Sequence, residues 1–181
     1  MFEITFLMMF IFITVLWVVT RCIVIFKSGK FDIKREAKLL LVYTCLVVIA
    51  RFVYFPLQRI DGHVGVLEFD GSRIFPFKTN LIPFTFVVDR YEGWQVNIIG
   101  NIAMFIPVGI VWPVCFDELK RINKAILAGA GFTLLIELSQ LLFYDRCSDI
   151  DDIILNTAGI CIGALIYFKA TSPRIKKPAK S

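Results

Sequence analysis

Carboxylates and carboxamides gather between residues 134 and 163, in a stretch that is otherwise apolar. Glu137 and Gln140 fall late in one apolar segment, while Asp149, Asp152 and Asn156 open the next. Ionisable groups at membrane depth are costly and mark functional sites by default. Spacings of three, four and seven residues place each set on one helix face. The pattern therefore predicts two polar faces that meet near one membrane surface.

The sequence leaves two interpretations of this polar pattern open. A buried Glu137 must be neutral, paired or hydrogen-bonded, because an isolated carboxylate in hydrocarbon is strongly destabilising. One interpretation is a Glu137–Arg51 pair, or an Asp pair with Arg146, that only fixes helix packing. The other, which we favour, is a polar pocket open to the outer leaflet, because the polar groups outnumber the needs of one ion pair.

Metal and nucleophilic chemistry receive little support from the sequence. Hard divalent cations take carboxylate oxygens, so Glu137, Asp149 and Asp152 are conceivable ligands, but no metal motif accompanies them and we assign no metal or cofactor. No Ser or Cys has a His partner, and the five cysteines show no CxxC spacing. Neither a zinc site nor a full disulfide framework is therefore expected, and no residue is assigned as catalytic.

The composition indicates what positions these side chains. Of the 181 residues 57% are hydrophobic and only 19% are charged, against roughly 45–50% and a quarter in soluble domains. The excess forms five blocks of membrane-spanning length, at residues 4–26, 39–57, 97–116, 125–143 and 152–168. The fold class is therefore an all-α integral membrane protein with about five transmembrane helices.

The basic residues give this chain a predicted orientation. They account for the net charge of +5 and lie mainly in residues 27–38, 120–124 and 169–181. Basic loops stay on the cytoplasmic side and favour contact with anionic lipid; a nucleic-acid partner is not indicated. The N-terminus is then outside and the C-terminus cytoplasmic. Glu137 would lie about 9 Å below the outer end of its helix, at 1.5 Å per residue.

Residues 58–95 are predicted to be external, and they contain an unusual aromatic and apolar piece at 75–90. Pro76 and Pro83 break this piece, which is too short to span. We expect a re-entrant or interfacial segment whose Lys78 and Asn80 face a docked ligand. Further polar groups reach the same external half: Arg51 in the second span and, four residues apart on the third, Asn97 and Asn101. Gly159 and Gly163 form a GxxxG pair that favours close helix packing.

An ordered set of short motifs resembles the VanZ-like family of bacterial membrane proteins. The matching residues are Asn80-Leu-Ile-Pro-Phe84, Asn97-Ile-Ile-Gly-Asn101, Phe105-Ile-Pro-Val-Gly109, Glu137 with Gln140, Arg146 with Asp149 and Asp152, and Asn156-Thr-Ala-Gly159 with Gly163. The resemblance divides the chain into two N-terminal helices with their basic loop (1–57), a VanZ-like domain (58–168) and a basic tail (169–181). It implies a cell-envelope location and association with low-level glycopeptide resistance, notably to teicoplanin.

The leading hypothesis is a protein that binds membrane lipid and a lipid-linked cell-wall precursor or glycopeptide at the outer leaflet. The carboxamides would supply hydrogen bonds, the cations would meet an anionic headgroup, and the carboxylates would orient the cations. The predicted ligand-binding residues are Arg51, Lys78, Asn80, Asn97, Asn101, Glu137, Gln140, Arg146, Asp149, Asp152 and Asn156. The alternative is a membrane enzyme acting on a lipid-linked precursor, with Glu137 or Asp152 as general base. Whether the protein is an enzyme, and its oligomeric state, stay open.

Overall fold

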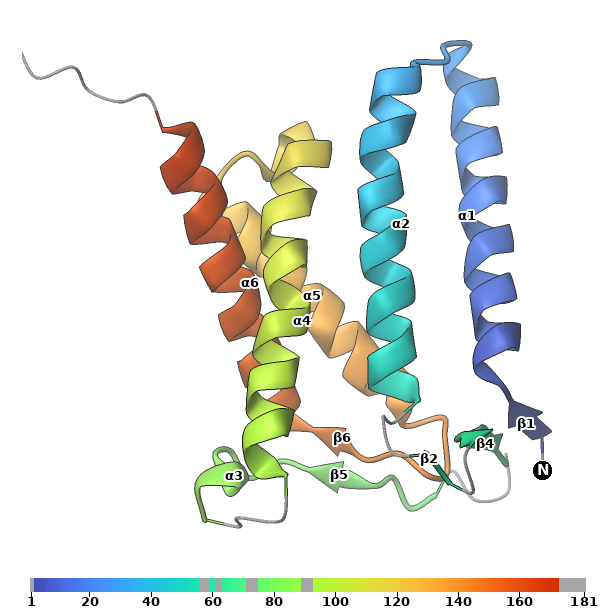
Figure 1. Cartoon of the computed structure of the whole chain (residues 1–181), viewed down its shortest axis with the longest axis vertical. Coiled ribbons are helices and arrows are strands. Elements are labelled where there is room, and N and C mark those ends of the chain that lie inside the picture. Colours follow the sequence, from blue (N-terminus) through green and yellow to red (C-terminus); the bar gives the residue numbers. More distant parts are fainter. Residues whose placement is uncertain (1, 56–58, 61–62, 71–74, 89–92, 173–181) are drawn as a thin grey trace, which may run out of the picture.

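Five long helices form a bundle in the computed structural model, which describes residues 2–55, 59–60, 63–70, 75–88 and 93–172 (Figure 1). They are α1 (Phe6–Ser28), α2 (Ile33–Tyr54), α4 (Trp94–Cys115), α5 (Ile122–Gln140) and α6 (Ile150–Thr171). Each is long and apolar enough to cross a membrane. The chain is thus a multi-pass, all-α membrane protein, and the predicted fold class is confirmed.

Two short helical elements, α3 (Thr85–Val88) and η1 (Asp117–Leu119), and six short strands complete the described chain. The strands pair as β1 (Phe2–Ile4) with β4 (Leu67–Phe69), β2 (Arg59–Ile60) with β3 (His63–Val64), and β5 (Thr79–Asn80) with β6 (Ser148–Asp149). Only the β5–β6 pair is parallel, with Asn80 opposite Asp149. These strands and α3 lie across the end of the bundle at which α1 begins (Figure 1).

Local capping explains where the helices depart from the predicted spans. The second helix begins at Ile33 rather than 39, because the Asp32 side chain accepts hydrogen bonds from the N–H groups of Lys34 and Arg35. A capped N-terminus carries the helix through basic residues that hydropathy assigns to a loop. The fourth span ends at Gln140 instead of 143. Glu137 therefore lies within the last turn of α5, nearer the bundle end than predicted.

Glycines set the close packing of α4 against α6. A Cβ on Gly159 would overlap the backbone oxygen of Ile102, and one on Gly163 would overlap that of Ile106. On the facing helix, a Cβ on Gly109 would overlap the backbone oxygen of Ile160. The predicted GxxxG pair is thus a helix contact, as small residues allow in membranes. Pro107 and Pro113 lie within an α4 that runs unbroken from Trp94 to Cys115.

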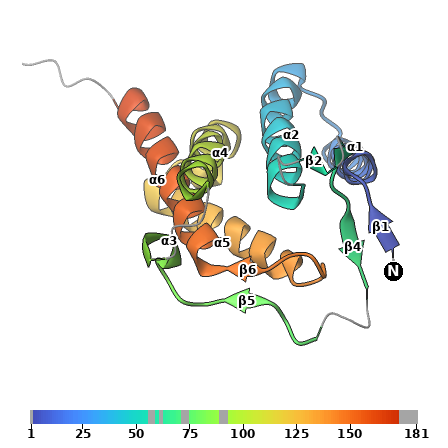
Figure 2. The same ribbon diagram turned by 60° about the horizontal axis from the view of Figure 1, so that its bottom comes forward.

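The first helix is peripheral. It lies beside α2 and apart from α4–α6 (Figure 2), and none of its residues is buried. Its contacts to α2 include a Thr14–Tyr43 hydrogen bond of 2.8 Å, a Trp17–Tyr43 ring contact and an Arg21–Glu36 ion pair. The core instead joins the other helices through Ile49, Phe105, Val108, Ile136 and Ile160.

The segment between the second and third spans lies across the bundle end. In both ribbon views β5 and α3 run over this end and do not enter between the helices (Figures 1 and 2). Of the two predicted alternatives, this arrangement favours the interfacial one. Residues 89–90, the last of the predicted piece, lie outside the described residues.

Candidate functional site

The first turn of α6 is the centre of the candidate site. Asp149 is its N-cap and accepts from the backbone N–H of Asp151, at 2.8 Å from Oδ1. Asp151 and Asp152 follow in the first turn. A helix N-terminus carries a partial positive charge and unpaired N–H groups, so it favours carboxylates there. This sequence therefore places three carboxylates where the backbone itself offsets part of their charge.

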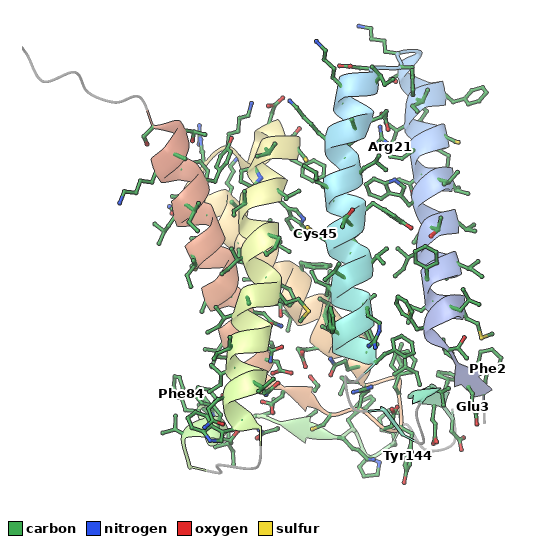
Figure 3. The ribbon with its side chains drawn as sticks, viewed as in Figure 1. Phe2, Glu3, Arg21, Cys45, Phe84 and Tyr144 are labelled. Atoms are coloured by element: carbon green, nitrogen blue, oxygen red, sulfur yellow. The ribbon has the colours of Figure 1, made fainter. Side chains whose placement is uncertain are left out.

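Asp151 ties the external segment to the bundle. Its carboxylate accepts from the backbone N–H groups of Phe84 (2.5 Å) and Thr85 (2.8 Å) and from the Thr85 hydroxyl (2.6 Å). Hydrogen bonds to an ionised acceptor are the stronger kind, and Asp151 is only 4% exposed. Figure 3 shows Phe84 at this end of the molecule, as it does Tyr144.

Glu137 reaches the same region from the last turn of α5. Its Oε2 accepts from the backbone N–H of Asp149 at 2.9 Å, and the side chain is 1% exposed. Asp149 in turn accepts from Asn80 Nδ2 at 3.0 Å. Asn80 Nδ2 also donates to the Thr85 hydroxyl at 3.1 Å. One network thus joins α5, β5 and the start of α6.

A second contact, through Asp152, links α6 to α4. Asn101 Nδ2 donates to Asp152 Oδ1 at 2.6 Å and also lies 3.3 Å from Asn97 Oδ1. Asn101 and Asp152 are half-buried, whereas Asn97 is exposed. The two asparagines, four residues apart, therefore lie on one helix face as the helix periodicity predicts. Their contacts lead from the exposed Asn97 through Asn101 to the Asp152 carboxylate.

Deeper in the bundle, Asn156 bridges α6 and α5. Its Nδ2 donates to the Thr133 hydroxyl at 2.9 Å, and both side chains are buried. Asn156 Oδ1 is buried without a hydrogen-bond partner in the structure. Gln140, also predicted for the site, is 5% exposed on the same helix as Thr133. We refer to Asn80, Asn101, Glu137, Asp149, Asp151, Asp152 and Asn156 as the acid–amide cluster.

The predicted cations do not join this cluster as expected. Arg51 Nη1 donates to the Phe55 carbonyl at 2.6 Å, and Lys78 Nζ donates to the Tyr144 carbonyl at 2.7 Å. Arg146 donates to the Tyr54 carbonyl and lies 3.7 Å from Asp145. Burial lowers the pKa of Arg146 from its ordinary value, and Asp145 partly offsets this. Within the described ranges, the structure gives no ion pair between Arg51 and Glu137 or between Arg146 and Asp149 or Asp152.

The physical reason is that free carbonyls at chain ends compete for these long side chains. Arg51 lies in the last turn of α2, where the terminal carbonyls lack helical partners and basic side chains bond to them. In the same way, Lys78 donates to the carbonyl of the loop residue Tyr144, and Arg146 donates to the carbonyl of Tyr54 at the end of α2. The carboxylates are instead satisfied by backbone N–H groups and amides, so they do not orient the cations.

Burial separates the cluster into two parts. Glu137, Asp151 and Asn156 are almost fully buried, whereas Asn80, Asn101, Asp149 and Asp152 retain partial exposure. The expected polar pocket is not the cavity that the structure contains between α1, α2 and α5, because no residue of the acid–amide cluster lines that cavity. The accessible part of the site consists of the partly exposed residues Asn80, Asn101, Asp149 and Asp152 at the bundle end.

A divalent cation has no geometric support here. The described part of the chain contains no group of three or more His, Cys, Asp or Glu side chains placed to hold a metal ion. The carboxylates point instead to different partners: Asp151 to the external segment, Asp152 to α4 and Glu137 to the loop before α6.

Two cluster-supporting residues escape prediction from the sequence. Asp151 falls off the face defined by Asp149, Asp152 and Asn156, so helix periodicity rejects it, although its first-turn position favours a carboxylate. Thr85 receives no signal, because its role depends on the path of residues 75–88 across the bundle.

The fold and site define a class: a multi-pass α-helical membrane protein with a carboxylate- and amide-rich cluster at one bundle end. The VanZ/LLP1 family model matches residues 40–171. The chain therefore belongs to the VanZ/LLP1 family, and the resemblance noted from its motifs is confirmed.

A curated relative agrees with this assignment. The chain is similar to "Protein VanZ" of Enterococcus faecium, with 33% identity over 88 residues, which is 49% of this chain. The match spans about half of that relative, 51% of its length. No solved structure matches the chain.

Proposed function

We propose that this VanZ-family protein binds a donor-rich ligand, a lipid-linked cell-wall precursor or a glycopeptide, at the outer surface of the cell membrane. The basic residues support this orientation. The α1–α2 connection, the α4–α5 connection and the last turn of α6 lie at the end opposite the β5–β6 pair (Figure 1). These segments and the adjoining helix ends carry Lys27, Lys30, Lys34, Arg35, Lys38, Lys120, Arg121, Lys124 and Lys169. Excess Lys and Arg marks the cytoplasmic side, so the cluster would face outward and the C-terminus inward.

One observation carries the proposal: the accessible edge of the cluster offers acceptors without a cation. Asp152 and Asn101 are half-buried beside the exposed Asn97, and Asp149 and Asn80 lie at the parallel β5–β6 pair. Within the described residues, no Lys or Arg makes an ion pair with Asp149 or Asp152. Carboxylates in this state favour N–H and O–H donors of a ligand, which peptide and sugar groups supply in abundance.

Family membership extends this proposal to drug susceptibility. The curated relative is named for VanZ, and the family resemblance implies association with teicoplanin resistance. Teicoplanin is a glycopeptide and so carries amide and hydroxyl donors of the kind that the edge would accept. We include a contribution to teicoplanin resistance in the proposed function.

The geometry favours binding over catalysis through Glu137. A general base must come within hydrogen-bond reach of its substrate, and Glu137 is 1% exposed with Oε2 held by the Asp149 N–H. Asp152 is half-buried, so a substrate could reach it. The enzyme alternative therefore remains with Asp152 as the general base. Turnover of a lipid-linked precursor that Asp152→Asn abolishes would favour the enzyme.

Native mass spectrometry in mild detergent tests the proposal. Wild type, Asp152→Asn and Asp117→Asn would each be incubated with a lipid-linked disaccharide-peptide precursor and, separately, with teicoplanin. Asp117→Asn is the matched control, since it makes the same change at the opposite end, where the side chain is 86% exposed.

We expect wild type and the control to retain one of the two ligands, and Asp152→Asn to lose at least about 80% of that complex, a difference of about 1 kcal/mol. Equal retention by all three proteins, or retention by none, would contradict the proposal. Gel filtration of each variant confirms that the fold is intact.

A further inference from the structure

We propose that the groove between α1, α2 and α5 holds the hydrocarbon chain of an anionic amphiphile whose charged head is met by Arg51. This inference rests on the proposed function, for which it assigns a place to the lipid part of the ligand. It uses residues that the acid–amide cluster does not contain, so the two can be tested apart.

The groove is a cavity of about 500 Å³. Ligand pockets in proteins typically have volumes of about 300–1,000 Å³. Its walls are apolar side chains of three helices: Ile13 and Trp17 from α1, Leu46 and Ala50 from α2, and Phe132 and Ile136 from α5. Such a surface matches an alkyl or isoprenoid chain, because it offers many dispersion contacts and few polar atoms.

The packing of α1 explains why this space stays open. The described contacts that hold α1 run to α2 and the residue after it: Thr14 and Trp17 to Tyr43, Arg21 to Glu36, and Phe6 to Phe55. Figures 1 and 2 both show α1 on the side of α2 away from α4 and α6. Phe132 and Ile136 therefore pack against the helical core and also line the groove, which α1 does not fill.

Two hydroxyl groups of the groove wall already have partners. The Tyr54 hydroxyl and the Ser139 hydroxyl hydrogen-bond to each other, and the Tyr54 ring meets Phe143 edge-on. Both hydroxyls lie towards the end where α2 finishes. The occupant of the groove therefore has no need to supply hydrogen bonds there, which suits a hydrocarbon chain.

Arg51 supplies the charge that selects the head of the amphiphile. It follows Ala50, a lining residue, and its guanidinium carbon lies 5.6 Å from the Phe6 ring and 5.5 Å from the Phe52 ring. Among the described residues it makes no ion pair with a carboxylate. A cation near membrane depth is costly unless it is neutralised, and a guanidinium suits phosphate or carboxylate oxygens. Charge complementarity thus favours an anionic amphiphile over a zwitterionic one.

Trp17 provides a probe inside the groove. The chain has three tryptophans, so Trp94→Phe with Trp112→Phe leaves Trp17 as the only one. This protein would be titrated in detergent with a dibrominated long-chain alkyl phosphate, whose bromines quench tryptophan at contact. Brominated phosphatidylglycerol and phosphatidylcholine form two further arms, which distinguish a single-chain phosphate, an anionic bilayer lipid and a zwitterionic one.

We expect saturable quenching by the alkyl phosphate or phosphatidylglycerol, with Arg51→Gln raising the midpoint at least about fivefold. Arg51→Lys, which keeps the charge, should recover most of the affinity. Arg21→Gln is the matched control: it removes the same charge at the other end of the α1–α2 pair and should change the midpoint less than about twofold.

Filling the groove gives a second, independent variant. Ile13→Phe with Leu46→Phe adds bulk to two lining positions and should lower the maximal quenching at least about twofold. Val15→Phe with Val18→Phe adds at least as much bulk at exposed positions of α1 that do not line the groove, and it should have no effect.

Quenching that rises linearly with bromolipid content, equal for Arg51→Gln and Arg21→Gln, would overturn the inference. So would a preference for phosphatidylcholine, which would mark bulk lipid. Asp152→Asn should leave the quenching curve unchanged. If Asp152→Asn abolishes precursor binding while quenching is linear, the proposed function stands and the groove assignment fails. If quenching is saturable and depends on Arg51 while Asp152→Asn leaves precursor binding unchanged, the groove assignment stands and the proposed function fails.

Discussion

The two ends of the helix bundle carry charge in opposite ways. At the basic end, the Asp117–Lys120 ion pair is solvated, with side chains 86% and 56% exposed. At the other end, Glu137 and Asp151 are almost fully buried and are held by backbone N–H groups. The first arrangement is solvated and tolerant of change; the second depends on a specific fold.

This difference separates a topology signal from a built site. Exposed ion pairs contribute little to stability, roughly 0–1 kcal/mol, so the basic end works through its total charge. A buried carboxylate that loses its donors is left unsatisfied at a cost of about 1–3 kcal/mol or more. Equal substitutions at the two ends should therefore have unequal effects, and that inequality is what the following experiments measure.

The largest effect is expected where α4 and α6 hold the cluster together. Gly163→Leu forces a side chain into the Ile106 backbone oxygen; overpacking usually costs about 1–3 kcal/mol, and a clash with backbone should reach the upper end or prevent folding. Gly131→Leu is the control, because a Cβ there meets nothing within 4 Å. Thermal unfolding in detergent measures both; equal midpoints would contradict the close α4–α6 contact.

Asp151→Asn should have the next largest effect. The amide keeps one acceptor but loses the charge-assisted bonds to Phe84 and Thr85, a loss of about 1–3 kcal/mol. Hydrogen exchange of residues 79–88 should rise at least about tenfold, while the same residues are unchanged in Asp117→Asn. Similar exchange in the two variants would show that the ends do not differ in this way.

Thr133→Val should be intermediate, because it leaves Asn156 Nδ2 without its buried partner. The expected loss is about 1–2 kcal/mol. Since Asn156 Oδ1 is already unpaired, the double variant with Asn156→Leu should be less destabilised than the sum of the single variants. Unfolding by denaturant gives the three values. Strict additivity would mean that the Thr133–Asn156 contact carries no energy.

The smallest effect is expected at the Arg21–Glu36 pair, a 2.5 Å contact between α1 and α2. The pair is bidentate and its side chains are only 17% and 20% exposed, but the introduced amide keeps an acceptor for Arg21. Glu36→Gln should therefore cost about 1 kcal/mol and should leave the unfolding of α4–α6 unchanged. Limited proteolysis between α1 and α2 is the suitable readout. A loss as large as that of Asp151→Asn would make the two ends energetically alike.

Much of this architecture could be predicted from the sequence. Hydropathy finds the five spanning helices because membrane length and apolar composition determine them directly. Helix periodicity and topology bring Asn101, Glu137, Asp149, Asp152 and Asn156 to one end. In the structure Asn101 bonds to Asp152 and the Asp149 N–H bonds to Glu137, whereas Asn156 bonds to Thr133. Their role in binding a ligand stays a prediction.

The partners of the long cations could not be predicted. Arg51 and Lys78 bond to carbonyls whose positions depend on where a helix stops and how a loop turns. Asp151 was missed because its partners, Phe84 and Thr85, are more than sixty positions away in the sequence. The periodic spacing of apolar residues shows which face of a single helix is buried. It does not show which residues of other segments contact that helix.

Orientation is the claim on which the rest depends: the acid–amide cluster must face outward. Cys147 is exposed in the loop before α6, and a variant with alanine at Cys22, Cys45, Cys115 and Cys161 keeps it as the only thiol. The control moves that thiol to the basic end by adding Cys147→Ala and Glu118→Cys. Partial burial and nearby Asp149 raise the pKa of Cys147, so labelling proceeds through its thiolate and should accelerate as the pH rises.

Intact cells expressing each variant would be treated with a membrane-impermeant maleimide at mildly alkaline pH. We predict that Cys147 is labelled in intact cells, and that the Glu118→Cys variant is labelled only after permeabilisation. Labelling of the Glu118→Cys variant in intact cells, with Cys147 protected, would place the cluster in the cytoplasm and contradict an outer-surface binding site.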